Sequence, residues 1–337
     1  MKAWFIRSYG GPDVLEFGEV AEPVVSPRDI LVDIRAASVN PIDNRVRKGE
    51  LKQLVKYQFP LLMGTDLAGV VTAVGRDVRR FAVGDEVYAR PNRQRIGSFA
   101  ERISVHEDEA ALKPKSLTFE EAASIPLVGL TSRQAMIELG NIKPGHKILI
   151  HAGAGGVGTF AIQLAKHLGA HVATTASKAK HELVRSLGAD EVIDYRNQDF
   201  AQALSDYDMV FDTQGCDTLM KSFDVLREGG IVVSVSGPPD LELTRTWPMP
   251  FYLKLGIRAI SWKVRHRAKT RKCRYRFMLM QPSGVQLAEI ATLIDGGIIR
   301  PVIDKIYPLE RVKEAIAHSE TGRATGKIVI SRGLGKI

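Results

Sequence analysis

The sequence predicts an α/β protein of two domains, in which a compact antiparallel β domain of barrel type is joined to a doubly wound parallel sheet. Two observations support this prediction: short β runs fill the first third of the chain, and strands alternate with helices beyond about residue 126. The length agrees, because 337 residues exceed what one hydrophobic core usually holds. The hydrophobic content of 45% and charged content of 25% are ordinary for a folded globular protein.

Up to about residue 125, short apolar runs are separated by Gly, Pro and Asp. The clearest strand candidates are Ile30–Ile34, Ala68–Val74 and Asp85–Ala89. Turn residues at such short spacing are typical of antiparallel strands and favour a barrel-like β domain.

From about residue 126 the pattern changes. Five short apolar runs have strand character: Lys147–His151, His171–Thr175, Glu191–Asp194, Asp208–Asp212 and Ile231–Val235. Helical spacing follows the first two runs and stops at Gly169 and Gly188, and another helix is expected at about 217–227. This alternation implies right-handed βαβ units and a parallel, doubly wound sheet.

The last part of the chain is expected to return to the first domain. Its predicted elements are a helix at 287–294, a strand at Ile298–Ile303, a helix around 309–319 and a strand at Lys327–Ile330. We therefore expect residues 1–125 and 281–337 to form one domain. Residues 126–280 form the other, with a basic insertion at about 245–276.

The positive charge is concentrated in this insertion. Residues 263–276 hold eight Lys or Arg and no acid, whereas the formal net charge of the whole chain is +9. The rest is therefore near neutral, which excludes the diffuse basic surface of a nucleic-acid coat, and no DNA partner is expected. An amphipathic helix is predicted before it from four apolar positions: Leu253, Ile257, Ile260 and Val264. The alternating charges that follow are expected to form a solvated protrusion.

The location expected from the sequence is cytoplasmic. No run approaches the roughly 20 apolar residues of a membrane span, and the start of the chain lacks a signal-peptide pattern. The only cysteines, Cys216 and Cys273, suit a reducing compartment.

A glycine-rich turn in the second domain predicts a dinucleotide site. Gly153, Gly155 and Gly158 fit G-x-G-x-x-G, with Gly156 and Val157 between the last two, and the motif leaves a predicted strand to open a predicted helix. The glycines permit a tight turn, close approach of a pyrophosphate and close helix–strand packing. The alternative is a glycine-rich turn without a ligand.

The end of the next strand favours NADP(H) over NAD(H). An NAD site usually places an acid there, about 20 residues on. Residues 176–180 hold instead a hydroxyl, Ser177, and two ammonium groups, including Lys180, which suit a 2′-phosphate. Tyr195 and Arg196 follow the third strand and can close the same corner. The alternative is that the lysines are merely solvated.

No metal site is expected. Residues 1–150 contain no Cys, and His106 and His146 lack ligand spacing, so a four-cysteine zinc site is excluded. Without a Lewis acid, reduction of an activated C=C bond or a quinone is favoured, because charge then appears on a conjugated oxygen.

Several motifs spread over nearly the whole chain carry a family resemblance. They are Ala37–Asp43 with Arg47–Gly49, Gly64–Val71, Leu130–Thr131, Ala152–Gly158 and Ala324–Lys327. The chain resembles the medium-chain dehydrogenase/reductase superfamily, on its zinc-free branch of quinone oxidoreductases and NADPH-dependent alkenal/enone reductases. Thr65 stands where zinc enzymes of the superfamily have a ligand histidine. The resemblance implies a GroES-like catalytic domain, a Rossmann domain and a homodimer joined through the last Rossmann strand.

The resemblance also implies roles for individual residues. Asn40 would border the nicotinamide and the reacting oxygen, or else only fix an Asn-Pro turn. Thr131 would contact the carboxamide, with a hydroxyl at a helix start as the alternative. Ser236 and Gly237 would lie near the nicotinamide, or form a plain turn. Tyr57 is the nearest candidate proton donor, because Arg45 stands where some quinone reductases carry a Tyr.

The function favoured by these features is hydride transfer from NADPH to an enone, an enal or a quinone. One alternative is a zinc-free alcohol dehydrogenase-like enzyme, and another is a zeta-crystallin-like RNA-binding protein that uses the basic segment. A weak contact of residues 250–276 with an anionic membrane surface is a further hypothesis, since Trp247, Phe251, Tyr252 and Trp262 lie among the cations.

Overall fold

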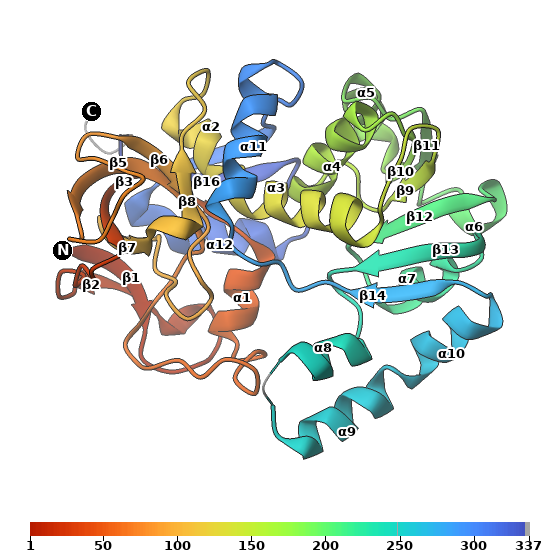
Figure 1. The fold of residues 1–337 in the computed structure, drawn as a ribbon, viewed down its shortest axis with the longest axis horizontal. Coiled ribbons are helices and arrows are strands. Elements are labelled where there is room, and N and C mark those ends of the chain that lie inside the picture. Colours follow the sequence, from red (N-terminus) through yellow and green to blue (C-terminus); the bar gives the residue numbers. More distant parts are fainter. Residues whose placement is uncertain (248, 334–337) are drawn as a thin grey trace. The chain divides into compact units, whose positions relative to one another are not determined.

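The computed structural model of the chain describes residues 1–247 and 249–333. The chain divides into two compact units, Met1–Leu130 with Gln281–Ile337, and Thr131–Met280 (Figure 1). None of the described helices is long and apolar enough to cross a bilayer.

The first unit is mainly antiparallel β structure. Its strands are β1 (Lys2–Ile6), β2 (Leu15–Glu19), β3 (Asp29–Val39), β4 (Leu61–Leu62), β5 (Asp66–Val74), β6 (Glu86–Ala89), β7 (Arg102–His106), β8 (Ala110–Leu112), β15 (Ile303–Pro308) and β16 (Lys327–Ser331). They form a three-stranded sheet, β2-β1-β4, and a larger sheet in the order β15-β16-β3-β5-β6-β8, with β7 paired to β3. The predicted β domain is confirmed, and the antiparallel β16–β3 pair shows that the end of the chain completes it.

Helices accompany these sheets. They are α1 (Pro41–Arg47), α2 (Phe119–Ala123), α11 (Gly284–Asp295) and α12 (Val312–Glu320), while α3 (Pro126–Arg133) runs across the division between the units. One core cluster contains the fully buried Phe99 and Ile316, so β1, β16 and α12 share it with the loop before β7. A second lies between β3, β5 and β7 around Ile34 and Val71.

The second unit is a parallel sheet with helices. Its strands are β9 (Lys147–Ile150), β10 (His171–Ala176), β11 (Glu191–Asp194), β12 (Tyr207–Asp212), β13 (Leu226–Ser234) and β14 (Arg274–Phe277). Its α-helices are α4 (Gly156–His167), α5 (His181–Ser186), α6 (Phe200–Ala203), α7 (Cys216–Ser222), α8 (Leu241–Thr246), α9 (Phe251–Ile260) and α10 (Trp262–Thr270). The strand order is β11-β10-β9-β12-β13-β14, and every adjacent pair is parallel. The predicted doubly wound sheet is confirmed, with its order reversing between β9 and β12.

Two sequence-based boundaries are wrong. The strand expected at Ile298–Ile303 begins only at Ile303, because Gly297 turns the chain with a φ of 71° and Pro301 has no N–H for a ladder. The helix expected at about 217–227 is α7, which ends at Ser222, and β13 begins at Leu226.

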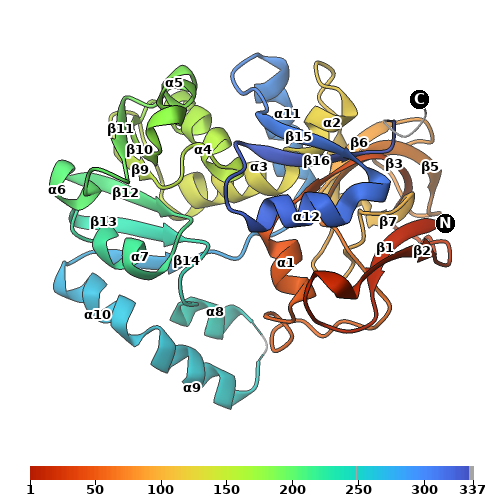
Figure 2. The ribbon, with the colours of Figure 1, turned by 180° about the vertical axis from the view of Figure 1, so that it is seen from behind.

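The basic insertion is not solvated on all sides, because one side of α10 packs against the second unit. Val264 and Ala268 of α10 are buried in the core cluster of the second unit, and α10 runs alongside β14 in both views (Figures 1 and 2). Arg267 forms two hydrogen bonds with the Asp224 carboxylate, at 2.6 and 2.7 Å. Asp224, 43 positions away, thus neutralises Arg267, whose side chain the sequence alone predicts to be solvated.

Candidate functional site

The glycine-rich turn lies between β9 and α4, and Thr175 of β10 fixes its start. The Thr175 Oγ1 accepts a hydrogen bond from the Ala152 N–H at 3.0 Å, and the Thr175 carbonyl oxygen accepts one from Gly153 at 3.0 Å. Ala152 has a φ of 53°, a conformation that costs a non-glycine residue free energy and is often retained at ligand-binding turns. The chain then enters α4 with Gly155 as its N-cap.

The three motif glycines differ in the space around them. A Cβ atom at Gly153 would lie 2.1 Å from Thr174 Oγ1, and one at Gly158 would lie 2.3 Å from the Ala152 carbonyl oxygen. Packing therefore closes both positions. A Cβ atom at Gly155 would meet only the Ala152 oxygen, at 3.3 Å, and otherwise points into open space. Only Gly155 leaves room for a ligand to approach the backbone.

This open position lies at the N-terminus of α4. Gly156, Val157 and Gly158 form the first turn, and their N–H groups have no acceptor within the helix. Unpaired N–H groups and the positive end of the helix dipole both favour an anion. The residues present therefore fit the pyrophosphate of a dinucleotide.

The predicted 2′-phosphate residues follow β10 and β11 at the carboxyl edge of the sheet. Ala176 of β10 is paired with Asp194 of β11, so the residues that follow, Ser177 and Tyr195, leave the sheet side by side. Lys180 closes the 3-10 turn that begins after Ser177, and its N–H donates to the Ser177 carbonyl oxygen at 2.8 Å. A hydroxyl, an ammonium and an exposed phenol at one corner fit a phosphate monoester.

Ser236 and Gly237 follow β13 at the same edge. The exposed Ser236 Oγ donates to the Thr213 carbonyl oxygen at 2.9 Å, and the Gly237 N–H donates to Ser234 Oγ at 2.7 Å. A Cβ atom at Gly237 would lie 2.5 Å from the Tyr275 hydroxyl, so this turn needs a glycine for packing as well.

Thr131 lies in the last turn of α3 and is buried. The alternative interpretation, a hydroxyl at a helix start, is therefore wrong. Contact with the cofactor carboxamide stays a prediction.

In the first unit, Asn40 lies between β3 and α1 and is 1% exposed. Its Nδ2 donates to Thr65 Oγ1 at 3.1 Å and to Asp66 Oδ2 at 2.8 Å, and its Oδ1 accepts from Lys327 Nζ. Both N–H bonds of the amide thus have protein partners. The Asn40 backbone N–H also donates to Asp43 Oδ2 at 2.8 Å, so this residue fixes the start of α1.

Strand register brings these side chains together. The Cα partners are Ser38 with Asp66 in β3–β5 and Val39 with Ile328 in β3–β16. Asn40 and Lys327, one position beyond that pair, therefore lie opposite each other at the end of the sheet. Lys327 Nζ also lies 3.5 Å from Asp66 Oδ2, and Ser38 Oγ donates to the same oxygen at 3.1 Å.

Four buried ionisable side chains, Asp43, Asp66, Arg90 and Lys327, form what we call the charged cluster. Burial raises the pKa of Asp43 from 3.8 to about 7. Burial also lowers the pKa of Lys327 and of Arg90, while the neighbouring carboxylates oppose both shifts. Asp43 therefore exchanges a proton near neutral pH, whereas each cation compensates part of the cost of burying an anion.

Tyr57 is half-buried against the core of the first unit. Burial raises its pKa to about 12, and the charges of Arg90 and Asp43 also act on it, in opposite directions. The phenol is therefore protonated at neutral pH and lies within electrostatic range of the charged cluster.

The described residues, 1–247 and 249–333, contain no group of three or more His, Cys, Asp and Glu side chains arranged to hold a metal ion. Thr65, at the position of the superfamily's zinc-ligand histidine, accepts the hydrogen bond from Asn40 instead.

The charged cluster does not follow from the sequence motifs. Its one sequence signal is Lys327, a lysine that opens the otherwise apolar strand Ile328–Ile330. A buried strand position occupied by Lys requires a partner, but neither Asp66 nor Asn40 is near it in sequence.

Comparison with known families covers most of the chain. Residues 26–115 match the alcohol dehydrogenase GroES-like domain, and residues 187–330 match the zinc-binding dehydrogenase family. Residues 127–214 match the C-terminal domain of alanine dehydrogenase/PNT.

Two curated relatives align along nearly the whole chain. The human mitochondrial NAD(P)H oxidoreductase RTN4IP1 is 37% identical, over 98% of this chain and 89% of its own length. The chloroplastic NADPH-dependent alkenal/one oxidoreductase of Arabidopsis thaliana is 36% identical, over 98% of this chain and 79% of its own.

Solved structures share the fold. The Escherichia coli quinone oxidoreductase complexed with NADPH is 27% identical with a TM-score of 0.82, covering 98% of this chain and 100% of its own. A structure described as an NAD-dependent alcohol dehydrogenase is 30% identical with a TM-score of 0.84, covering 98% of this chain and 99% of its own.

Proposed function

The chain belongs to the medium-chain dehydrogenase/reductase superfamily, on its zinc-free branch, and we propose that it transfers a hydride from NADPH to an α,β-unsaturated carbonyl or a quinone. It is an NADP(H)-dependent oxidoreductase whose substrate is a small electrophilic molecule. We assign catalysis to the GroES-like unit, residues 1–125 with 281–337, and cofactor binding to residues 126–280.

The observation that carries this proposal is the carboxyl edge of the second unit's sheet. Gly155 leaves the N-terminus of α4 open for a pyrophosphate. Ser177, Lys180 and Tyr195 follow the two strands that end where an NAD site would place an acid. In this proposal, Thr131, Ser236 and Gly237 surround the nicotinamide.

When bound, NADPH supplies a hydride to the electrophilic carbon of the substrate. The chain's part is to orient the reactants, exclude water and manage the proton that the product gains. Asn40 borders the reacting centre in this proposal, but both its N–H donors are engaged, so its amide is a fixed surface rather than a free donor. The protonated phenol of Tyr57 is the proposed proton source.

The experiment is a matched substrate panel followed by NADPH absorbance. An enone and the saturated ketone of the same carbon skeleton are compared, together with a quinone and the corresponding alcohol with NADP⁺. Turnover of the enone or quinone, without turnover of the saturated ketone, is expected. Oxidation of the alcohol as the faster reaction would favour alcohol dehydrogenation, which the similarity to an alcohol dehydrogenase structure keeps as the second candidate.

Two further points rest on the sequence and the resemblance. We propose a homodimer through the free edge of β14, the outermost strand of the parallel sheet, and sedimentation velocity tests it. The two curated relatives are named mitochondrial and chloroplastic, so the cytoplasmic location stays a prediction that cell fractionation tests.

A further inference from the structure

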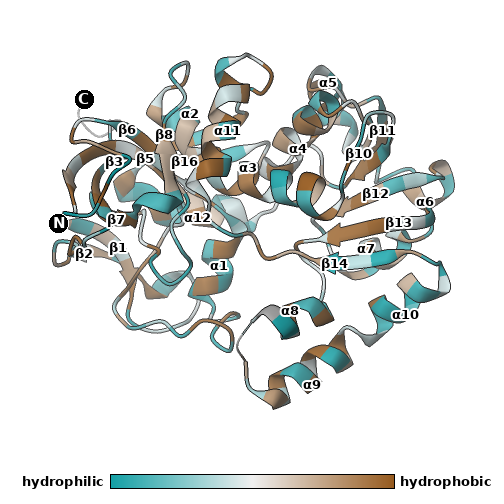
Figure 3. Cartoon of the chain, in the orientation of Figure 1, coloured by the Kyte–Doolittle hydropathy of each residue, from teal (hydrophilic) through white to brown (hydrophobic). Residues whose placement is uncertain are grey.

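Helices α9 and α10 have a second apolar face, directed away from the core. Their inward face is formed by Ile257, Val264 and Ala268, which are buried. Five large apolar side chains are instead between 57% and 73% exposed: Phe251, Tyr252, Leu255, Ile260 and Trp262. Ile260, expected on the buried side, is among them. Hydrophobic and hydrophilic residues both occur along α9 in Figure 3.

The cations of this region fall into two groups. Arg267, Lys272 and Arg276 are paired with Asp224, Glu228 and Asp240 of the same unit. Lys254, Arg258, Lys263 and Lys269 have no acidic partner among the described residues, and residues 250–276 contain no acid at all. These four unneutralised cations thus lie on α9 and α10, the helices that also expose the apolar side chains.

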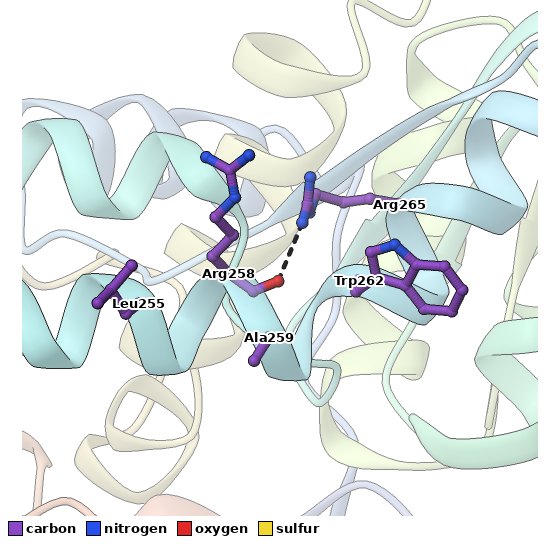
Figure 4. Close-up of a pocket in the computed structure, with 5 residues that line it drawn as sticks. All are labelled: Leu255, Arg258, Ala259, Trp262 and Arg265. Atoms are coloured by element: carbon purple, nitrogen blue, oxygen red, sulfur yellow. Dashed lines mark hydrogen bonds between the residues drawn. The ribbon is translucent and has the colours of Figure 1, made fainter.

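A shallow hollow of about 630 Å³ lies on this face. Leu255, Arg258, Ala259, Trp262 and Arg265 line it (Figure 4). Arg265 Nη2 donates to the Arg258 carbonyl oxygen at 2.9 Å, which holds the Arg265 guanidinium beside α9, while the Arg258 side chain extends from the helix. Two guanidinium groups next to an indole and a leucine suit a phosphate group attached to an apolar chain.

We propose that this face, defined by α9 and the first turn of α10, docks peripherally on an anionic phospholipid bilayer. The exposed aromatic and aliphatic side chains enter the headgroup region, and Lys254, Arg258 and Lys263 contact lipid phosphates.

Two other occupants fit this face less well. A second copy of the chain would present the same cations, so a symmetric contact would bring like charges together. RNA would engage the cations and stack on aromatics, but it offers nothing to the exposed aliphatic side chains of Leu255 and Ile260. The proposal does not depend on the oxidoreductase reaction.

The test is co-sedimentation of the full chain with vesicles of phosphatidylcholine alone, or of phosphatidylcholine with phosphatidylglycerol. Binding only to the anionic vesicles is expected, and it should fall steeply as salt rises. A charge variant carries Lys254→Gln, Arg258→Gln and Lys263→Gln. Its partition coefficient should fall about a hundredfold, at about 1 kcal/mol for each basic residue.

A matched control variant loses the same charge elsewhere, through Lys115→Gln, Lys143→Gln and Arg185→Gln, three exposed positions. It should bind anionic vesicles like the wild type. A third variant, Leu255→Ser with Trp262→Ser, tests the apolar part and should weaken binding even at low salt. NADPH turnover should be unchanged in all three, which verifies that they fold.

Four outcomes would overturn the proposal. They are equal binding to neutral vesicles, equal losses in the charge variant and its control, sedimentation of the protein without vesicles, and displacement from vesicles by RNA at equal phosphate concentration. The third would show that the protein associates with itself under these conditions, and the fourth would identify the face as a site for nucleic acid.

Discussion

The buried ammonium group of Lys327 donates to the side-chain carbonyl oxygen of Asn40, a residue 287 positions away in the sequence. This contact, with those from Asn40 to Thr65 and Asp66, fixes the orientation of the amide. The turn that begins α1 is thus held by a hydrogen bond from a lysine near the other end of the chain.

Lys327→Met should destabilise the first unit strongly, because the buried Asp66 carboxylate would lose the ammonium group that lies 3.5 Å from it. Removal of one partner from a buried pair costs about 3–5 kcal/mol. Urea denaturation measures this loss of stability. The double variant Lys327→Met with Asp66→Asn should recover part of this loss, and additive losses in the double variant would contradict the coupling.

The glycine turn allows a sharper separation of fold from binding. Gly155→Ala should fold, with a loss within about 1 kcal/mol, because its methyl group meets no close atom except the Ala152 oxygen. It should nevertheless bind NADPH at least tenfold more weakly. Gly153→Ala should lose stability instead, since its methyl group would overlap Thr174. Fluorescence titration measures the loss of NADPH affinity, and denaturation measures the loss of stability. Wild-type NADPH affinity in Gly155→Ala would contradict the assignment of pyrophosphate binding to this turn.

Lys180→Ala should weaken NADPH binding by roughly ten- to a hundredfold, since a charge-assisted hydrogen bond contributes about 1.5–3 kcal/mol. NADH binding should hardly change because NADH lacks the 2′-phosphate. Lys178→Ala, which removes an exposed lysine in the same 3-10 turn, is the matched control. Equally weakened binding of NADPH and NADH would indicate that Lys180 stabilises the fold and does not bind the 2′-phosphate.

The free energy of unfolding should depend on pH through the ionisation of Asp43. Its folded-state pKa of about 7 lies above the ordinary value of 3.8, so between these values the folded protein retains a proton that the unfolded chain loses. The stability from this group therefore falls as pH rises from about 4 to about 7. Asp43→Asn, which cannot ionise, should lack this fall. Parallel curves of stability against pH for the wild type and Asp43→Asn would contradict this role of Asp43.

The sequence predicts the second unit well because its signals are local. Apolar runs of strand length, the glycine turn between β9 and α4, and the missing acid after β10 all lie within a few residues of one another. The two corners proposed to bind phosphate follow from these signals and from the rule that parallel strands end at one edge.

The charged cluster and the packing of α10 could not be predicted in this way. The cluster depends on the register of β16 with β3, which brings Lys327 opposite Asn40, and a one-residue slip would separate them. The alternating charges of α10 predict a helix that is solvated on all sides. In the structure Arg267 instead pairs with Asp224, and no sequence pattern links these two residues.

The central claim is hydride transfer from NADPH to an electrophilic carbon, and isotope transfer tests it most directly. NADPH carrying deuterium on the transferred position of C4 is incubated with an enone, and the product is examined by mass spectrometry and NMR. The account predicts one deuterium at the former β-carbon and a solvent-derived proton at the α-carbon. Enone reduction with no deuterium in the product would contradict it, and so would an allylic alcohol with deuterium on the carbon that bears the hydroxyl.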